Sequence, residues 1–226
     1  MIKRWCIPPD ENAAFVAAME DILEVYRRPR NPARPLVCLD EFAKQLVDHH
    51  TAPLAASPGS VIKEDYEYVR RGSVTVFMMY APLEGWREVY VGPTGQRTAL
   101  DYAEALRILA EDIYPGAEKI VLVQDNLDIH APASLYKAFP PEKARELVQR
   151  FEWHFTPKHG SWLNMAENEI GIFTRTILRD RIGSKEEFFI QSKAGCQRRN
   201  DCSNKINWKF TAEDARIKMS KTYPTT

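Results

Sequence analysis

Three acidic residues lie in apolar surroundings, and their positions could support metal-dependent chemistry. Asp40 lies within or at the end of a short apolar run, and Asp125 ends a second one. Glu167 borders the apolar stripe of a predicted helix, between Leu163 and Ile170. An unpaired buried carboxylate costs free energy, and pairing or metal coordination avoids that cost. The three side chains are therefore candidates for one site.

Whether they converge depends on the fold. In α/β sheets, ligands bind in the crevice at the carboxyl ends of the strands. If the strands of Asp40 and Asp125 are neighbours and the Glu167 helix packs across them, three carboxylates meet. Hard oxygen ligands of this kind suit Mg²⁺ or Mn²⁺. Two such ions about 3.5–4 Å apart can activate a water or a 3′-hydroxyl and stabilise a leaving oxygen, which is phosphodiester chemistry.

Each acid alone has a simpler interpretation. An Asp at the end of a strand is commonly a turn or cap residue, and a Glu on a helix is commonly solvated. Glu169 also lies near the helical stripe, so periodicity does not separate it from Glu167. Glu41 and Asp128 are further acids near the site and secondary candidates for metal contact.

The elements that must position these residues follow from periodicity and from the proline and glycine positions. Their mixture of strands and flanking helices indicates an α/β layered domain. Helices are predicted within 9–34, 98–114, 140–150 and 163–182, after Ser184 and after Thr211. Strands are predicted at 36–42, 119–126 and 151–157, and a meander at 66–92 with turns at Arg71–Gly72 and Glu84–Gly85; residues 51–64 are expected to form a loop.

Two of the predicted helices carry a core-facing stripe at helical spacing. The first stripe is Leu100, Ala103, Leu106, Leu109 and Ile113. The second stripe is Leu163, Ala166, Ile170, Phe173 and Ile177. Ser184 and Glu187 have the spacing of a capping box that starts a further helix.

The charge is balanced overall but unevenly distributed. The chain of 226 residues has 31 Lys and Arg and 31 Asp and Glu, so its formal net charge is zero. The stretch 175–221 holds twelve basic and six acidic residues, a net charge of +6, which leaves −6 on the rest. Nucleic-acid binding depends on local basic charge that releases counterions from phosphates. A balanced total therefore does not exclude a DNA partner.

Several stretches of the chain carry a specific family pattern. They are 36–41 (LVCLDE), 121–147 (VLVQDNLDIHAPASLYKAFPPEKAREL), 151–170 (FEWHFTPKHGSWLNMAENEI), 197–200 (QRRN) and 206–218 (INWKFTAEDARIK). Together they resemble the bacterial insertion-sequence transposases of the mariner-like superfamily, which are DDE endonucleases. The resemblance covers nearly the whole chain and implies an RNase H-like, retroviral integrase-type fold, with a mixed five-stranded sheet flanked by helices.

The resemblance implies roles for particular residues. The catalytic and metal-binding acids fall on Asp40, Asp125 and Glu167, and the motif favours Glu167 over Glu169. It implies two Mg²⁺ or Mn²⁺ ions per site and a DNA substrate, with a homodimer or larger assembly on DNA. Supporting residues around the carboxylates are expected at Asn126, His130 and Asn164. DNA contacts are expected at Lys158, His159, Arg198, Arg199, Lys205 and Lys209.

Other polar and aromatic residues have structural interpretations. Ser161 is expected to cap the Glu167 helix. Trp153, Trp162 and Trp208 are expected to pack in the core rather than stack on bases. A solvated basic helix remains an alternative for the C-terminal charge.

The organisation of the chain is predicted in three segments. Residues 1–34 form an N-terminal helix and proline-rich linker, 35–183 the catalytic domain, and 184–226 a basic helical extension. Fewer than about forty residues precede Asp40 and offer one helix, so a helix-turn-helix module that reads element ends is not expected within them. The four cysteines lack C-x-x-C spacing and are expected to be reduced thiols. With no signal-peptide core or membrane-length apolar run, a cytoplasmic, nucleoid-associated bacterial protein is expected.

Three other functions remain open at this stage. The chain could be another RNase H-like nuclease acting on RNA–DNA hybrids or junctions. It could be an inactive or domesticated remnant that binds DNA or acts as a scaffold. A glycosidase with two carboxylates is the third, although no sugar-stacking pattern supports it.

Overall fold

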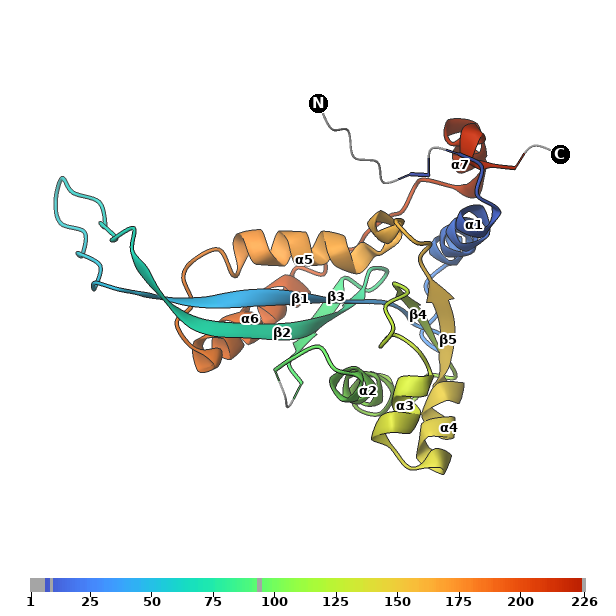
Figure 1. Ribbon diagram of the computed structural model, residues 1–226, viewed down its shortest axis with the longest axis horizontal. Coiled ribbons are helices and arrows are strands. Elements are labelled where there is room, and N and C mark those ends of the chain that lie inside the picture. Colours follow the sequence, from blue (N-terminus) through green and yellow to red (C-terminus); the bar gives the residue numbers. More distant parts are fainter. Residues whose placement is uncertain (1–6, 9, 93–94, 225–226) are drawn as a thin grey trace.

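A five-stranded mixed sheet forms the centre of the computed structural model, which describes residues 7–8, 10–92 and 95–224 (Figure 1). The strand order is β3-β2-β1-β4-β5. β1, β2 and β3 pair antiparallel, whereas β1, β4 and β5 pair parallel. The strands are β1 (Leu36–His49), β2 (Tyr68–Ala81), β3 (Trp86–Tyr90), β4 (Ile120–Gln124) and β5 (Phe151–Phe155). The predicted mixed five-stranded α/β sheet is confirmed.

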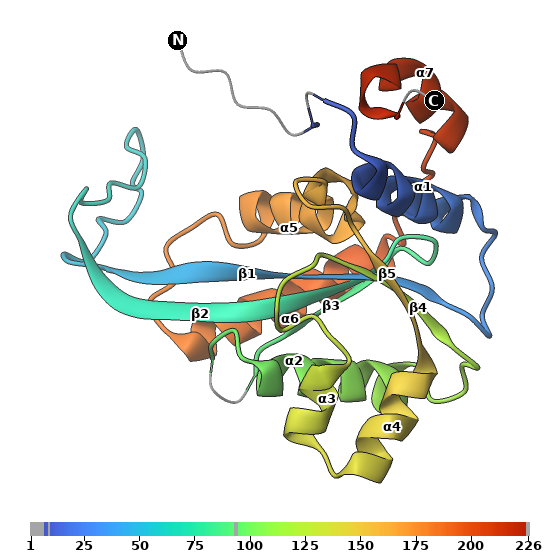
Figure 2. The same cartoon turned by 45° about the vertical axis from the view of Figure 1, so that its right-hand side comes forward.

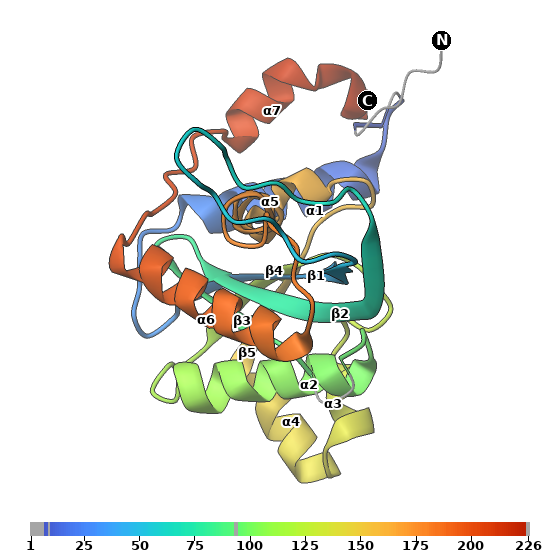
Figure 3. The ribbon, with the colours of Figure 1, turned by 90° about the vertical axis from the view of Figure 1, so that its left-hand side faces the viewer.

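Helices cover both faces of this sheet and one of its edges. In Figures 2 and 3, α1 and α5 lie on one face, α2, α3 and α4 lie on the other, and α6 packs against β3. The α-helices are α1 (Ala13–Arg27), α2 (Ala99–Ile108), α3 (Ala133–Ala138), α4 (Pro141–Arg150), α5 (Met165–Thr176), α6 (Lys185–Asp201) and α7 (Ala212–Lys218). The shorter turns are the π-helical η1 (Leu109–Ile113) and the 3₁₀ helices η2 (Ser161–Leu163) and η3 (Ser220–Thr222).

The sheet separates two hydrophobic cores because successive strand side chains point to opposite faces. In β1, Leu36 and Cys38 enter the core under α1 and α5, which we call the upper core. Val37 and Leu39 enter the core against α2, α3 and α4, which we call the lower core. The upper core also takes buried residues from α6 and α7, so both ends of the described chain pack against it.

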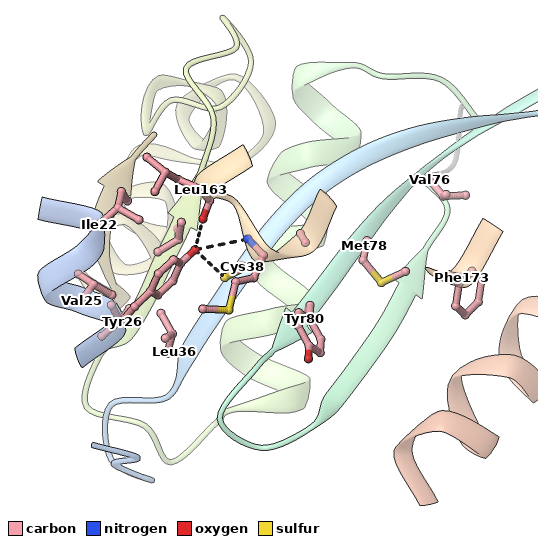
Figure 4. Packing of buried hydrophobic residues seen from close by; sticks show 14 of the residues in the cluster. Ile22, Val25, Tyr26, Leu36, Cys38, Val76, Met78, Tyr80, Leu163 and Phe173 are labelled. Atoms are coloured by element: carbon pink, nitrogen blue, oxygen red, sulfur yellow. Dashed lines mark hydrogen bonds between the residues drawn. The ribbon is translucent and has the colours of Figure 1, made fainter. Parts of the chain in front are cut away.

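Tyr26 of α1 links the upper core to the start of α5 (Figure 4). Its hydroxyl donates to the carbonyl of Leu163 at 2.6 Å and lies 3.5 Å from the Cys38 sulfur. The Met165 amide donates back to it at 3.4 Å. Since the Tyr26 side chain is buried, these contacts satisfy its hydroxyl and fix the chain just before α5.

The predicted turn at Arg71–Gly72 is wrong, whereas the turn at Glu84–Gly85 is present. β2 continues through Gly72, whose φ is +97°. The register between β1 and β2 shifts at this level, between Gln45 and Val47. Gly72 therefore serves a β-bulge, which needs the left-handed backbone region that glycine adopts freely. In consequence β1 and β2 are longer than predicted and project as an arm (Figure 1).

Three helix predictions also need correction. The helix predicted at 163–182 is only α5, which begins at Met165 and ends at Thr176. Beyond this end, the ammonium group of Lys44 binds the Leu178 carbonyl at 2.6 Å. Leu100 is exposed, and Tyr102 is buried instead in the lower core. α3 was not predicted, since its six residues are too few to show a periodic stripe.

The remaining predictions concern thiols and membranes. In the described ranges Cys38, Cys196 and Cys202 are free thiols, as expected, and Cys6 lies outside those ranges. None of the helices in the described part of the chain has the length and apolar character that a membrane crossing requires.

Candidate active site

The register of β1 and β4 brings Asp40 and Asp125 to the same level of the sheet. The two strands pair in parallel up to Cys38 and Val123, and each acid lies two residues beyond that pair. Cys38 and Val123 both point into the upper core, so side chains two residues further point to the same face. The two carboxylates therefore lie on the face that α5 covers, as the sequence predicts.

Asn164 connects this pair of strands to α5. Its side-chain oxygen accepts from the Ala166 amide at 3.1 Å and caps the helix. Its side-chain nitrogen donates to the Leu39 carbonyl at 2.9 Å and to Asp40 Oδ2 at 3.2 Å. Asn164 is completely buried, so the start of α5 is fixed directly over Asp40. Ser161 was expected to cap α5, but it begins η2 instead.

Glu167 lies in the first turn of α5 with its side chain exposed. Its charge is close enough to act on Asp40, where it contributes to a raised pKa. Glu169, by contrast, is only 2 % exposed and pairs with two arginines, Arg87 and Arg199. The structure thus separates the two glutamates that periodicity left equivalent: the charge of exposed Glu167 acts on Asp40, whereas Glu169 is buried against two arginines.

The electrostatics of Asp40 fit a cation among the carboxylates. Burial, followed by the charges of Glu41, Asp125 and Glu167, raises the pKa of Asp40 to about 7, although the Glu41 amide donates to its Oδ1. A bound divalent ion would remove this repulsion and replace lost hydration. The donors are all carboxylate oxygens, the ligand type that Mg²⁺ and Mn²⁺ prefer. The donor chemistry of these residues therefore suits the metal ions that the sequence predicts.

His130 is buried between two of the acids. Its Nδ1 makes a short contact with Asp125 Oδ1, and its Nε2 lies 3.1 Å from Glu41 Oε2. Burial lowers the pKa of His130, but the two carboxylates outweigh burial and raise it to about 9. Burial in turn raises the pKa of Asp125, yet the hydrogen bond and charge of His130 leave it below its ordinary value. The contact with His130 thus orients Asp125, and the raised pKa of the ring favours its protonated form at neutral pH.

Buried neighbours hold the His130 segment in place. The Gln124 side chain donates to the His130 carbonyl at 2.9 Å and accepts from the Tyr102 hydroxyl at 2.7 Å. The Tyr102 ring packs against the imidazole with 4.9 Å between centroids. Arg97 binds Glu41 Oε1 at 2.8 Å, so Glu41 is shared between two cations.

Sequence reasoning missed Tyr102, Gln124 and Arg97 as neighbours of the site. Gln124 immediately precedes Asp125 in an apolar run, and this was the only local signal.

A groove of about 560 Å³ opens beside Asp125. Asn126, Lys158 and His159 line it, and Asn126 donates to the Thr156 carbonyl at 2.9 Å, across to the end of β5. Lys158 and His159 are exposed. The structure therefore places two of the expected DNA-contact residues next to the carboxylates.

The expected C-terminal contacts fall in two groups. Arg198, Lys205 and Lys209 are exposed on or after α6. Arg199 is paired with Glu169 at 2.7 and 2.9 Å and is mostly buried. α6 packs at the β3 edge, whereas the carboxylates lie between β1 and β4, so none of these four residues belongs to the carboxylate cluster.

The three tryptophans pack as expected. Trp162 and Trp208 contact the upper core, and Trp153 contacts the lower core.

A comparison with known protein families matches residues 35–189 to the DDE superfamily endonucleases. The match includes Asp40, Asp125 and Glu167 and spans more than half of the chain. The chain belongs to the DDE superfamily endonuclease family. No significant match was found among curated protein sequences.

Solved structures with a similar fold are transposase complexes. The Mos1 strand transfer complex is 15 % identical and matches 100 % of this chain and 67 % of the Mos1 chain, with a TM-score of 0.61. A pre-cleavage Mos1 transpososome is 14 % identical and matches 100 % of this chain and 68 % of the Mos1 chain, with a TM-score of 0.53. The chain spans about two thirds of the length of these proteins and shares the fold of that transposase.

Proposed function

We propose that this DDE endonuclease domain cleaves DNA at the end of an insertion sequence and transfers that end to target DNA. Asp40, Asp125 and Glu167 are the proposed catalytic carboxylates and metal ligands. The observation that carries the proposal is their placement: Asp40 of β1 and Asp125, directly after β4, lie two residues beyond the same strand pair, and Asn164 at the start of α5 binds Asp40 three residues before Glu167. Bound Mg²⁺ or Mn²⁺, two ions by this proposal, would activate the attacking oxygen and offset charge on the leaving oxygen.

The chain's own residues orient the ligands and the substrate. Asn164 and the Glu41 amide each hold one oxygen of Asp40. His130 and the Leu127 amide both contact Oδ1 of Asp125, so these contacts leave Oδ2 of Asp125 for a ligand. Lys158 and His159 would contact phosphates in the groove beside Asp125. Exposed basic side chains at Arg198, Lys205 and Lys209 would contact DNA further away, and Arg199 is left out because Glu169 occupies it.

The proposed reaction consists of two phosphoryl transfers with no covalent protein intermediate. In the first, water attacks a phosphorus atom, the bond from phosphorus to the 3′-oxygen breaks, and a free 3′-hydroxyl and a 5′-phosphate result. In the second, that 3′-hydroxyl attacks a phosphorus atom of target DNA and displaces its 3′-oxygen. Since the similar structures are Mos1 complexes for strand transfer and pre-cleavage, we also propose that two or more copies assemble on DNA.

The test is a nicking assay on element-end DNA with and without Mn²⁺. Asp125→Asn is expected to lose at least about 100-fold of the metal-dependent cleavage, because it removes a proposed ligand. Glu142→Gln is the control, since Glu142 is an exposed acid in the first turn of α4, and it should cleave as wild type does. Undiminished cleavage by Asp125→Asn would refute the assignment, and preferential cleavage of RNA–DNA hybrids would favour a different RNase H-like nuclease.

A further inference from the structure

Glu169 joins three elements through a buried charge cluster that the proposed chemistry does not use. Its Oε1 lies 3.0 Å from Arg87 Nε of β3, and its two oxygens accept from Arg199 of α6 at 2.7 and 2.9 Å. Glu169 and Arg87 are 2 % and 0 % exposed, so water screens the pair little. The cluster fixes the side of α5 that carries Glu169 against β3, the edge strand of the sheet, and against α6.

Arg87 is itself held rigidly. The Asn200 amide group accepts from the Arg87 backbone amide and donates to the Arg87 carbonyl, both at 2.9 Å. The Asn200 side-chain oxygen also accepts from Arg87 Nη1 at 3.1 Å, and the guanidinium lies over the Tyr80 ring at 5.3 Å. Glu169 therefore binds a partner that cannot easily move with it.

Helix geometry links this anchor to Glu167. Two residues along an α-helix correspond to a rotation of roughly 200°, so Glu167 and Glu169 point to nearly opposite sides of α5. Asn164 fixes the beginning of the helix on Asp40, and Glu169 fixes its rotation about its own axis. Buried ion pairs often add little stability over well-packed apolar residues, and a fixed geometry is their better-attested use.

We propose that Glu169, with Arg87 and Arg199, is a positioning residue that aims the Glu167 carboxylate at Asp40 and Asp125. This inference rests on the proposed function, because it takes Glu167 as a metal ligand. Glu169 itself touches neither substrate nor metal. The structure gives it no exposed oxygen, and both of its oxygens are engaged by arginine.

The test measures Mn²⁺ binding to the full chain by titration calorimetry, without DNA or turnover. Glu169→Gln is expected to weaken Mn²⁺ affinity about 10-fold, as loss of a supporting partner does at metal sites. In a Glu167→Gln background the same change should alter affinity less than about 2-fold, because the aim of Glu167 no longer matters. Glu186→Gln, an exposed acid in the first turn of α6, is the control and should bind Mn²⁺ as wild type does.

A second variant covers the case in which Glu169→Gln does not fold. Arg199→Lys keeps the charge but loses the two-pronged contact, and it should weaken Mn²⁺ binding at least about 3-fold, again only when Glu167 is present. Wild-type Mn²⁺ affinity in the variants, or an equal loss with and without Glu167, would overturn the positioning role. If Glu167→Gln alone leaves Mn²⁺ binding unchanged, Glu167 is not a metal ligand and the proposed function itself is refuted. This result differs from the two that overturn only the positioning role.

Discussion

Asp40 is the residue at which burial and charge conflict most directly. Burial and three neighbouring acids raise its pKa from 3.8 to about 7. The metal-free folded protein therefore favours the protonated carboxyl. Its contribution to stability is complete below about pH 4 and is lost as pH rises through about 7. At neutral pH the ionisation of Asp40 therefore destabilises the metal-free protein. Binding of a cation to the ionised carboxylate would restore the most stability under these conditions.

This conflict gives a pH-dependent prediction for Asp40→Asn. Between pH 4 and pH 8 in chelator, the free energy of unfolding of the variant should improve relative to wild type by about 2–4 kcal/mol, since the uncharged amide does not pay for ionisation. Urea denaturation at both pH values measures the difference. Asp128→Asn serves as the control, and its difference in free energy of unfolding from wild type should be the same at both pH values. If the difference between Asp40→Asn and wild type is also the same at both pH values, the prediction is contradicted.

His130 gives a prediction with a different pH window. Its folded-state pKa is raised from 6.5 to about 9 by Asp125 and Glu41, against the effect of burial. Its stabilising contribution is therefore complete below about pH 6.5 and is lost as pH rises through about 9. The stability advantage of wild type over His130→Gln in chelator should shrink by about 2–3 kcal/mol from pH 6 to pH 10.

NMR titration of the His130 imidazole measures the same property directly. The ring should stay protonated at pH 8. Titration at the ordinary value near 6.5 would show that the two carboxylates do not act on it as the geometry requires.

At this scale the sequence could predict only part of the site. Apolar surroundings and family motifs pointed to Asp40, Asp125 and Glu167. Only the motif favours Glu167 over Glu169; periodicity does not separate them, because the arginines that bind Glu169 lie on β3 and α6, far away in the chain. The sequence around a charged residue near a helical stripe does not reveal a partner that lies on a distant element.

At the scale of elements, the site depends on how α5 begins. Three contacts converge there: the Asn164 cap, the Asn164–Asp40 hydrogen bond and the Tyr26 hydroxyl on the Leu163 carbonyl. The last of these comes from α1, which is remote in sequence. α1 thus supports the start of α5 as well as the upper core.

We therefore predict that Tyr26→Phe lowers the stability of the whole domain. The change leaves the buried Leu163 carbonyl without its donor, which should cost about 1–3 kcal/mol and lower Tm by roughly 2–10 °C for a chain of this size. Thermal unfolding followed by circular dichroism measures it. Tyr136→Phe, with a largely exposed ring on α3, is the control; equal Tm values for the two variants would show that the α1 contact is not needed.

The elements also show where pattern reasoning stops. The strands that carry or precede Asp40 and Asp125 follow from apolar runs, since continuous apolar stretches of this length indicate buried strands. The order of the strands in the sheet does not follow from them. The sequence predicts a turn at Gly72 because glycine is typical of both turns and bulges, and only the pairing with β1 distinguishes the two. α5 is shorter than the predicted helix, and the chain beyond it is bound at the Leu178 and Asp180 carbonyls by Lys44 of β1, a distant contact that has no local signal in the sequence.

At the scale of the molecule, the sequence predicts an uneven distribution of charge. In the fold, part of the basic charge is bound by other groups of the same chain. Arg181 binds backbone carbonyls at the base of the arm, Arg199 pairs with Glu169, and Arg216 pairs with Glu20. The +6 of the C-terminal quarter therefore overstates the positive charge available to a partner. Charge counting along the chain cannot reveal this, because each of these arginines finds its partner on a distant element.

The exposed lysines and the paired arginines should consequently differ in DNA binding. Phosphate contacts release counterions, so each lost contact should reduce the slope of log affinity against log salt by about 0.9 on duplex DNA. We expect this change for Lys158→Gln beside the carboxylates and a larger one for the double variant Lys205→Gln/Lys209→Gln. Binding should weaken by a similar factor on every DNA sequence, since phosphates carry no sequence information.

Arg216→Gln is the matched control, because it removes one basic charge from the same C-terminal quarter while its guanidinium is already bound to Glu20 at 2.8 Å. Its salt slope should equal that of wild type. Fluorescence anisotropy from about 50 to 200 mM salt resolves a slope change of this size, since each phosphate contact alters affinity several-fold over that range. If Arg216→Gln lowers the slope as much as Lys158→Gln does, total charge rather than its placement in the fold governs binding, and the groove beside Asp125 is not the DNA contact.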